Sequence, residues 1–193
     1  MRHGWSFIGA CFVIEIEVYG LGAIGSVPSW MYGMILAVFV VGCGDIVLTQ
    51  KTRKTQKIAI LLLVEYVALV FCTTVMFRNT RAASEINLMP LSSYFWIAEN
   101  SYLWEVSAIN LLNIAMFVPV GFLLKCGFRS IAWKKVLITG GILSATIEII
   151  QFIFCKGLCE IDDVIHNIVG CMLGYGIATL ILRGLKIALR NNN

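Results

Sequence analysis

Six apolar stretches, each close to 20 residues long, are the feature that most limits what this chain can fold into. They cover residues 6–24, 30–48, 58–77, 106–124, 136–154 and 164–182. A helix that crosses the hydrocarbon of a bilayer needs about 20 mainly apolar residues, and backbone groups in lipid must bond within their own segment. We therefore predict an all-α, polytopic membrane helix bundle of about six transmembrane helices, forming one domain over residues 1–193.

The composition excludes an ordinary soluble domain. Hydrophobic residues make up 59% of the chain and charged residues 13%, whereas soluble domains average roughly 45–50% and about 25%. The first stretch follows Arg2 and could also be a secretory signal. We expect a retained anchor, because no A-x-A-like cleavage site precedes Pro28.

Basic residues predict how the bundle is oriented. Of the 15 Lys and Arg residues, only Arg78, Arg81 and Lys156 fall on the side opposite to the amino terminus. Cytoplasmic segments of membrane proteins are rich in Lys and Arg, so we predict a multi-pass protein with both termini in the cytoplasm. The basic residues are scattered over separate loops, so we expect membrane lipids as partners and no nucleic acid.

The longest connection, residues 78–105, lies on the predicted outer side. Its aromatic residues are Tyr94, Phe95, Trp96, Tyr102 and Trp104. Aromatic side chains concentrate at the boundary between membrane and water. We therefore predict an interfacial or re-entrant segment in this loop.

Polar residues inside the apolar stretches are the candidates for function. Glu15 and Glu65 lie within the first and third stretches, where each could form a structural hydrogen bond or line a pathway. Pro119 should bend the fourth stretch or break its second half. Gly170, Gly174 and Ala178 have the spacing of small residues that let helices pack closely.

The last three stretches carry polar residues at matching depths. At 1.5 Å per residue, Asn113 and Glu148 lie roughly 10 Å and about 9 Å from the outer ends of their stretches. This pattern predicts a polar pocket open to the outside. The residues expected to bind a ligand there are Asn87, Asn110, Asn113, Glu148, Gln151, Lys156, Asp162, Asp163 and Asn167.

Simpler roles exist for several of these residues. The spacing of four predicts the pairs Asp162–His166 and Asp163–Asn167 on one helix, and either aspartate could cap that helix. The asparagines could serve only as interhelical hydrogen bonds. Glu148 has no such simple role, because a carboxyl group at that depth must pair, protonate or meet water.

Two of the seven cysteines, Cys155 and Cys159, lie in the predicted outer turn near His166. They could form a disulfide or bind a metal. The spacing is not that of a zinc site with a second pair to complete it. We therefore predict no metal and no cofactor.

Four ordered motifs resemble those of VanZ-like membrane proteins over about residues 78–178. They are Asn87-Leu88-x-Pro90, Asn110-x-x-Asn113 with Phe117-x-Pro119-x-Gly121, Glu148-x-x-Gln151, and Glu160-x-Asp162-Asp163-x-x-x-Asn167-x-x-Gly170-x-x-x-Gly174-Tyr175. The resemblance implies a bacterial cytoplasmic-membrane protein, in some members linked to lowered susceptibility to glycopeptides such as teicoplanin. It implies no established reaction. Lys156 stands where members often carry an arginine, and the two are not equivalent.

Three functions remain open. The preferred one is an envelope-associated binding protein, whose pocket holds a cell-wall precursor, a lipid-linked ligand or a glycopeptide. The second is a membrane hydrolase or transferase with Glu148 or Asp163 as general base and His166 as proton carrier, although no known catalytic motif is present. The third is a proton-coupled transporter that uses Glu15, Glu65 and Glu148. The sequence leaves the oligomeric state open.

Overall fold

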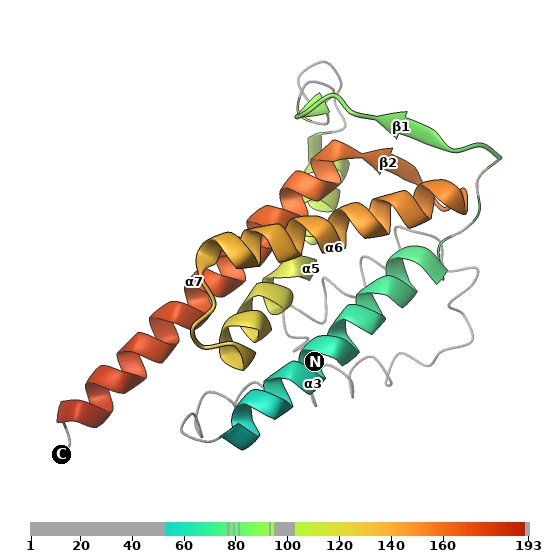
Figure 1. Cartoon of the computed structure of the whole chain (residues 1–193). Helices are drawn as coiled ribbons and strands as arrows, with labels where there is room; N and C mark the ends of the chain where they lie inside the picture. The colour runs from blue at the N-terminus through green and yellow to red at the C-terminus, as the bar shows by residue number, and fades with distance from the viewer. Residues whose placement is uncertain are drawn as a thin grey trace, which may run out of the picture.

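The computed structural model describes residues 53–76, 78, 80, 82–92, 94 and 103–191. Within these residues the fold is dominated by four long helices (Figure 1). They are α3 (Arg53–Phe71), which continues as the π-helix η1 (Cys72–Met76), α5 (Leu103–Gly127), α6 (Trp133–Ile153) and α7 (Ile161–Asn191). The predicted stretches 6–24 and 30–48, with Glu15, lie outside the described residues.

Each long helix is apolar enough to cross a bilayer. The candidate spans are Thr55–Met76, Asn110–Gly127, Trp133–Ile153 and Ile161–Ala188. Large hydrophobic side chains remain exposed along them, for example Val64 on α3, Ile142 on α6 and Leu180 on α7. A helix with apolar residues on its outer as well as its inner side is typical of a membrane span. The chain is therefore a helical membrane protein, with four candidate spans among its described residues.

Glycines let α5 and α7 approach closely. A Cβ atom added to Gly170 or Gly174 would fall inside the contact distance of the backbone carbonyl of Ile114 or Val118 on α5. Gly121 of α5 meets the carbonyl of Cys171 in the same way. The prediction of close packing through small residues is confirmed, and this crossing fixes where the polar residues of α5 face α7.

Pro119 does not break α5. The helix runs without interruption from Leu103 to Gly127, so of the two predicted alternatives, a bend or a broken second half, the break was wrong. Proline removes a single backbone donor, and packing against neighbours can make good that loss. One turn before it, the Tyr66 hydroxyl of α3 donates to the Met116 carbonyl at 2.9 Å.

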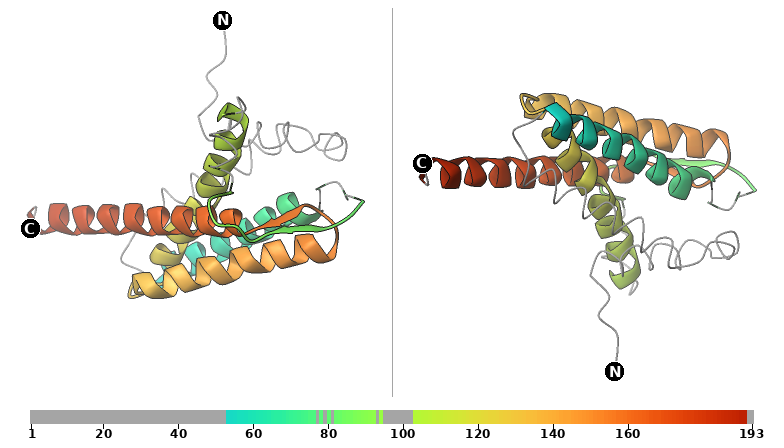
Figure 2. Two further views of the ribbon diagram at one scale, coloured as in Figure 1. Left: turned by 90° about the horizontal axis from the view of Figure 1, so that it is seen from above. Right: turned by 90° about the horizontal axis from the view of Figure 1, so that it is seen from below.

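A small parallel sheet, which the sequence did not predict, joins the long loop to the α6–α7 connection. Strand β1 (Glu85–Asn87) pairs with β2 (Leu158–Glu160) in the register Glu85↔Leu158 and Asn87↔Glu160. Both views in Figure 2 place the two strands at the end of the bundle away from the C-terminus. The sheet brings the residues that follow β1 to the beginning of α7.

Candidate functional site

Buried polar residues gather where α6 ends and α7 begins. Glu148 is 3% exposed and Gln151 2% exposed on α6, and Asp162, His166 and Asn167 are buried on α7. Asp163 of α7 and Asn113 of α5 are half-buried beside them. We call these residues, together with Arg78 and Ser144, the polar cluster.

Two carboxylates form the centre of the polar cluster. Asn113 donates through Nδ2 to Asp163 Oδ1 at 2.6 Å, and this bond joins α5 to α7. The backbone N–H of Glu160 donates to Glu148 Oε2 at 3.1 Å. Glu148 and Asp163 interact electrostatically across the α6–α7 interface. The polar residues of α5, α6 and α7 therefore do lie together.

Each carboxylate keeps an oxygen that no described residue engages. Among the described residues, none donates a hydrogen bond to Glu148 Oε1 or to Asp163 Oδ2. A buried carboxylate gains from every donor that it can reach, because burial removes its hydration. The pair can therefore accept hydrogen bonds from a bound molecule.

A second polar layer lies one turn further along both helices. Asn167, four residues after Asp163, donates through Nδ2 to the Ser144 hydroxyl at 2.8 Å. Ser144 stands four residues before Glu148 and is completely buried. Asn167 Oδ1 has no partner in the structure as described. Asp163 and Asn167, predicted to lie in register four residues apart, bond Asn113 and Ser144 on the neighbouring helices.

Gln151 turns toward η1 rather than toward Glu148. Its Nε2 donates to the Thr74 carbonyl at 2.8 Å. Its Oε1 is buried and has no partner among the residues described. The amide orientation is fixed, because a carbonyl can only accept.

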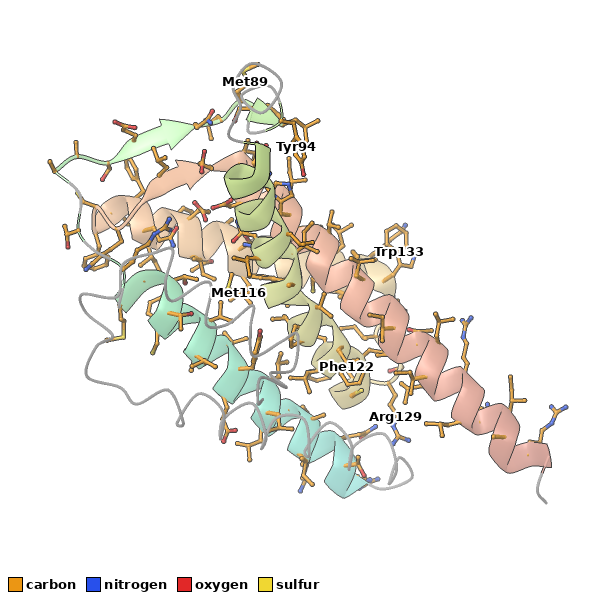
Figure 3. All side chains as sticks on the ribbon, turned by 180° about the vertical axis from the view of Figure 1, so that it is seen from behind. Met89, Tyr94, Met116, Phe122, Arg129 and Trp133 are labelled. Atoms are coloured by element: carbon orange, nitrogen blue, oxygen red, sulfur yellow. The ribbon has the colours of Figure 1, made fainter. Side chains whose placement is uncertain are left out.

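The end of β1 and the residues after it run along the beginning of α7, and we call residues 87–92 and 94 the loop segment. The Leu91 N–H and the Ser92 hydroxyl donate to Asp162. Further along, the Tyr94 hydroxyl and His166 Nε2 are 2.8 Å apart. Figure 3 shows Met89 at the tip of this segment and Tyr94 nearer to the helices. Asp162 and His166, predicted to pair four residues apart, interact electrostatically, and both side chains also bond the loop segment.

Asn87 and Asn110 are the remaining asparagines that were predicted to bind a ligand. Asn87 donates through Nδ2 to the Ser92 hydroxyl at 2.7 Å and to Glu160 Oε1 at 3.4 Å, and its own Oδ1 accepts from the Met89 N–H. Asn110 is buried on α5, three residues before Asn113. Asn87 therefore shapes the loop segment. Glu65, in contrast, is exposed on α3.

Arg78 is the residue that the sequence interpretation missed. Its guanidinium rests on Gly157, where an added Cβ would lie 2.9 Å from Arg78 Nη1. It interacts electrostatically with both Glu148 and Asp163. Lys156, which was predicted to bind the ligand, donates through Nζ to the Arg78 carbonyl at 2.9 Å. Arg78 could have been identified from its position, because it is one of only three basic residues on the predicted outer side.

Cys155 and Cys159 are free thiols, so the disulfide alternative was wrong. The described residues contain no group of three His, Cys, Asp or Glu residues that could hold a metal. Cys159 lies in β2, outside the helices. Burial raises the pKa of its thiol, and the nearby carboxylates of Glu148, Asp163 and Glu160 raise that pKa further.

Comparison with known proteins supports a family assignment. Residues 57–182 match the family model VanZ/LLP1. Protein VanZ of Enterococcus faecium is 44% identical over 69 residues, which are 34% of this chain and 43% of that protein. The chain thus aligns with less than half of that relative's length. No solved structure matches.

Proposed function

The chain belongs to the VanZ/LLP1 family, and on this premise we propose that it binds the polar part of an envelope ligand at Glu148 and Asp163. The ligand is a cell-wall precursor, another lipid-linked molecule or a glycopeptide. The protein would lie in the bacterial cytoplasmic membrane with six helices, both termini in the cytoplasm and the polar cluster facing outward. Binding there would contribute to resistance of the teicoplanin type.

One observation carries this proposal. Glu148 and Asp163 are neighbouring carboxylates, each held by one hydrogen bond and each with an oxygen that no described residue engages. Keeping a carboxylate away from water is unfavourable unless donors or counter-charges replace its hydration. Intramembrane acids of this kind generally mark functional sites. A ligand that brings donors would complete the site.

The position of His166 favours binding over hydrolysis. Its Nε2 bonds Tyr94, and the carboxylate that influences its ring is Asp162. Within the part of the chain that the structure describes, no hydrogen bond joins His166 to Glu148 or Asp163. A proton carrier must reach the general base directly or through one water. His166 instead serves to hold the loop segment.

The loop segment supports a site at the membrane boundary. Leu91 bonds the first turn of α7 and Tyr94 bonds His166 in the next turn, so the segment follows α7 into its span. Leu88 and Met89 are 68% and 58% exposed on it, and no charged residue occurs between Glu85 and Glu99. An uncharged segment with exposed apolar side chains suits an interfacial or re-entrant position.

The proposal is tested by ligand retention and by antibiotic susceptibility. We expect mild detergent extraction to recover an amphiphile with the wild-type protein that is lost from Asp163→Ala, as measured by mass spectrometry of the extracted lipids. In cells, Asp163→Ala should remove any teicoplanin protection that the wild-type chain gives. The exposed Glu65→Gln change is the matched control and should alter neither result. Identical lipids from wild type and Asp163→Ala would contradict a binding role.

Glu148→Gln separates binding from catalysis. The amide keeps the shape and an acceptor oxygen but cannot titrate. A binding site should retain a substantial part of its ligand, whereas a general base would lose its activity almost completely. Complete loss of protection in a Glu148→Gln protein that still retains the ligand would favour the hydrolase.

A further inference from the structure

The carboxylate pair has fewer positive charges than negative ones around it. The charged groups acting on Glu148 are Asp163, Arg78 and Glu160. Those acting on Asp163 are Glu160, Arg78 and Asp162. Arg78 is the single cation in that set. Lys156 directs its ammonium to the Arg78 carbonyl. Among the described residues, one guanidinium therefore faces the buried carboxylate of Glu148 and the half-buried carboxylate of Asp163, so one of the two has no counter-charge there.

In the pair itself, the oxygens that no described residue engages are Glu148 Oε1 and Asp163 Oδ2. Further along the same two helices, the buried atoms without a partner among the described residues are Gln151 Oε1, Asn167 Oδ1 and the ring nitrogen His166 Nδ1. Gln151 is 2% exposed and Asn167 3% exposed. The orientation of Gln151 is fixed by its bond to the Thr74 carbonyl. Acceptor oxygens in such a polar cluster are satisfied by a group that supplies donors.

We infer that the group bound between Glu148 and Asp163 is a protonated primary amine of the ligand. This inference rests on the proposed function and specifies the ligand chemistry. An ammonium has three donors, no acceptor and one positive charge, which matches both the unused oxygens and the missing counter-charge. A hydroxyl group fits less well, because it adds an acceptor and carries no charge. Arg78 then neutralises one carboxylate and the ligand neutralises the other.

The test compares two lipids that differ only at the amine. Phosphatidylethanolamine and its N-acetylated derivative are titrated separately into the purified full-length protein, and bound lipid is measured by native mass spectrometry. We expect the amine-bearing lipid to bind about tenfold more tightly, as for a charge-assisted hydrogen bond. Asp163→Asn should bring the affinity ratio close to one. Arg78→Gln should increase it, because this change removes the competing cation.

The ratio of the two lipid affinities also serves as a control for misfolding of a variant. A loss of folded protein lowers the signals of both lipids and leaves their ratio unchanged. Glu85→Gln removes one negative charge from exposed strand β1 at the same end of the bundle and should keep the wild-type ratio. Displacement of the lipid by free ethanolamine would show that a water-soluble amine is sufficient. Retention of the lipid would assign the ammonium to a lipid headgroup.

Two negative outcomes have different meanings. If both lipids bind equally and Asp163→Ala abolishes both, the amine inference is overturned while headgroup binding at the polar cluster stands. If Asp163→Ala changes the binding of neither lipid, and no other amphiphile is retained from cell extracts, both the proposed binding function and the inference fail.

Discussion

At the scale of single residues, electrostatic interactions as well as hydrogen bonds stabilise the polar cluster. The pKa of the Cys159 thiol is sensitive to the negative charge of that cluster. The thiol lies in β2, next to the backbone N–H that Glu160 donates to Glu148. Burial raises the pKa of the Cys159 thiol, and the carboxylates of Glu148, Asp163 and Glu160 raise it further, because negative charges oppose formation of a thiolate. The thiol is therefore a probe of the site that needs no ligand.

We predict that Glu148→Gln lowers the pKa of Cys159. The change removes one of the negative charges that oppose the thiolate, so more thiolate is present at any given pH and alkylation becomes faster. The measurement is the rate of maleimide modification between pH 7 and about pH 10, followed on the peptide that contains Cys159. Its midpoint should move to lower pH. Glu85→Gln is the control, and an equal shift in that variant would show that the effect is not local.

The sequence was sufficient to select most residues of the polar cluster but not their partners. Glu148, Gln151, Asn113 and Asp163 stand out because a polar group within an apolar stretch is unfavourable without a role. The spacing of Asp162 and His166 suggested a pair, yet it could not show that the loop segment lies against that face of α7. Arg78 was overlooked, because a basic residue at the end of a span has an ordinary interfacial interpretation.

At the scale of elements, the crossing of α5 and α7 depends on glycines at particular positions. We predict that Gly174→Ala destabilises the protein by about 1–3 kcal/mol or more, because the new methyl group would collide with the Val118 carbonyl of the α5 backbone. Gly176 lies on the same helix with nothing within 4 Å of an added Cβ. Gly176→Ala should therefore be neutral or slightly stabilising.

Thermal unfolding in detergent measures both glycine variants under the same conditions. A lower melting temperature for Gly174→Ala, with Gly176→Ala unchanged, would support backbone contact as the reason for the glycine. Equal melting temperatures for the two variants would contradict it.

The loop segment is a second element whose position depends on a few contacts. We predict that Asp162→Ala increases hydrogen exchange across the loop segment, because it removes the acceptor for the Leu91 N–H and the Ser92 hydroxyl. Leu91 has a φ of 60°, which is unfavourable for leucine and needs such support. Glu85→Ala, on the exposed neighbouring strand, should leave exchange in the segment unchanged. Unaltered exchange in Asp162→Ala would show that other contacts hold the segment.

The small sheet is the part of the described fold that could not be predicted from the sequence. The four described long helices followed from the length of their apolar stretches. Strands β1 and β2 contain three residues each, which is too short for a periodic pattern. Their pairing also joins segments more than 70 positions apart in the sequence, and nothing local signals such a contact. The same pairing places the loop segment, so its site contacts could not be predicted either.

At the scale of the whole molecule, the two ends of the bundle differ in charge. The connection between α5 and α6 and the helix ends beside it carry Lys125, Arg129, Lys134 and Lys135. Figure 3 shows Arg129 at the end of α5 away from Tyr94 and Met89. The end with the sheet instead carries the acidic residues of the polar cluster. Because basic segments are retained in the cytoplasm, the polar cluster should face outward.

We predict that Glu85→Cys is modified by a membrane-impermeant maleimide in intact cells, whereas Arg129→Cys is modified only after permeabilisation. Both positions are exposed, in β1 and after α5 respectively, so accessibility of the side chain is matched. Since the chain has seven native cysteines, modification is read on the peptide that contains each new position. The reverse pattern would turn the polar cluster toward the cytoplasm, where an extracellular glycopeptide could not reach Glu148 and Asp163. Of the functional proposal, only the binding of an amine in the inner leaflet would then remain.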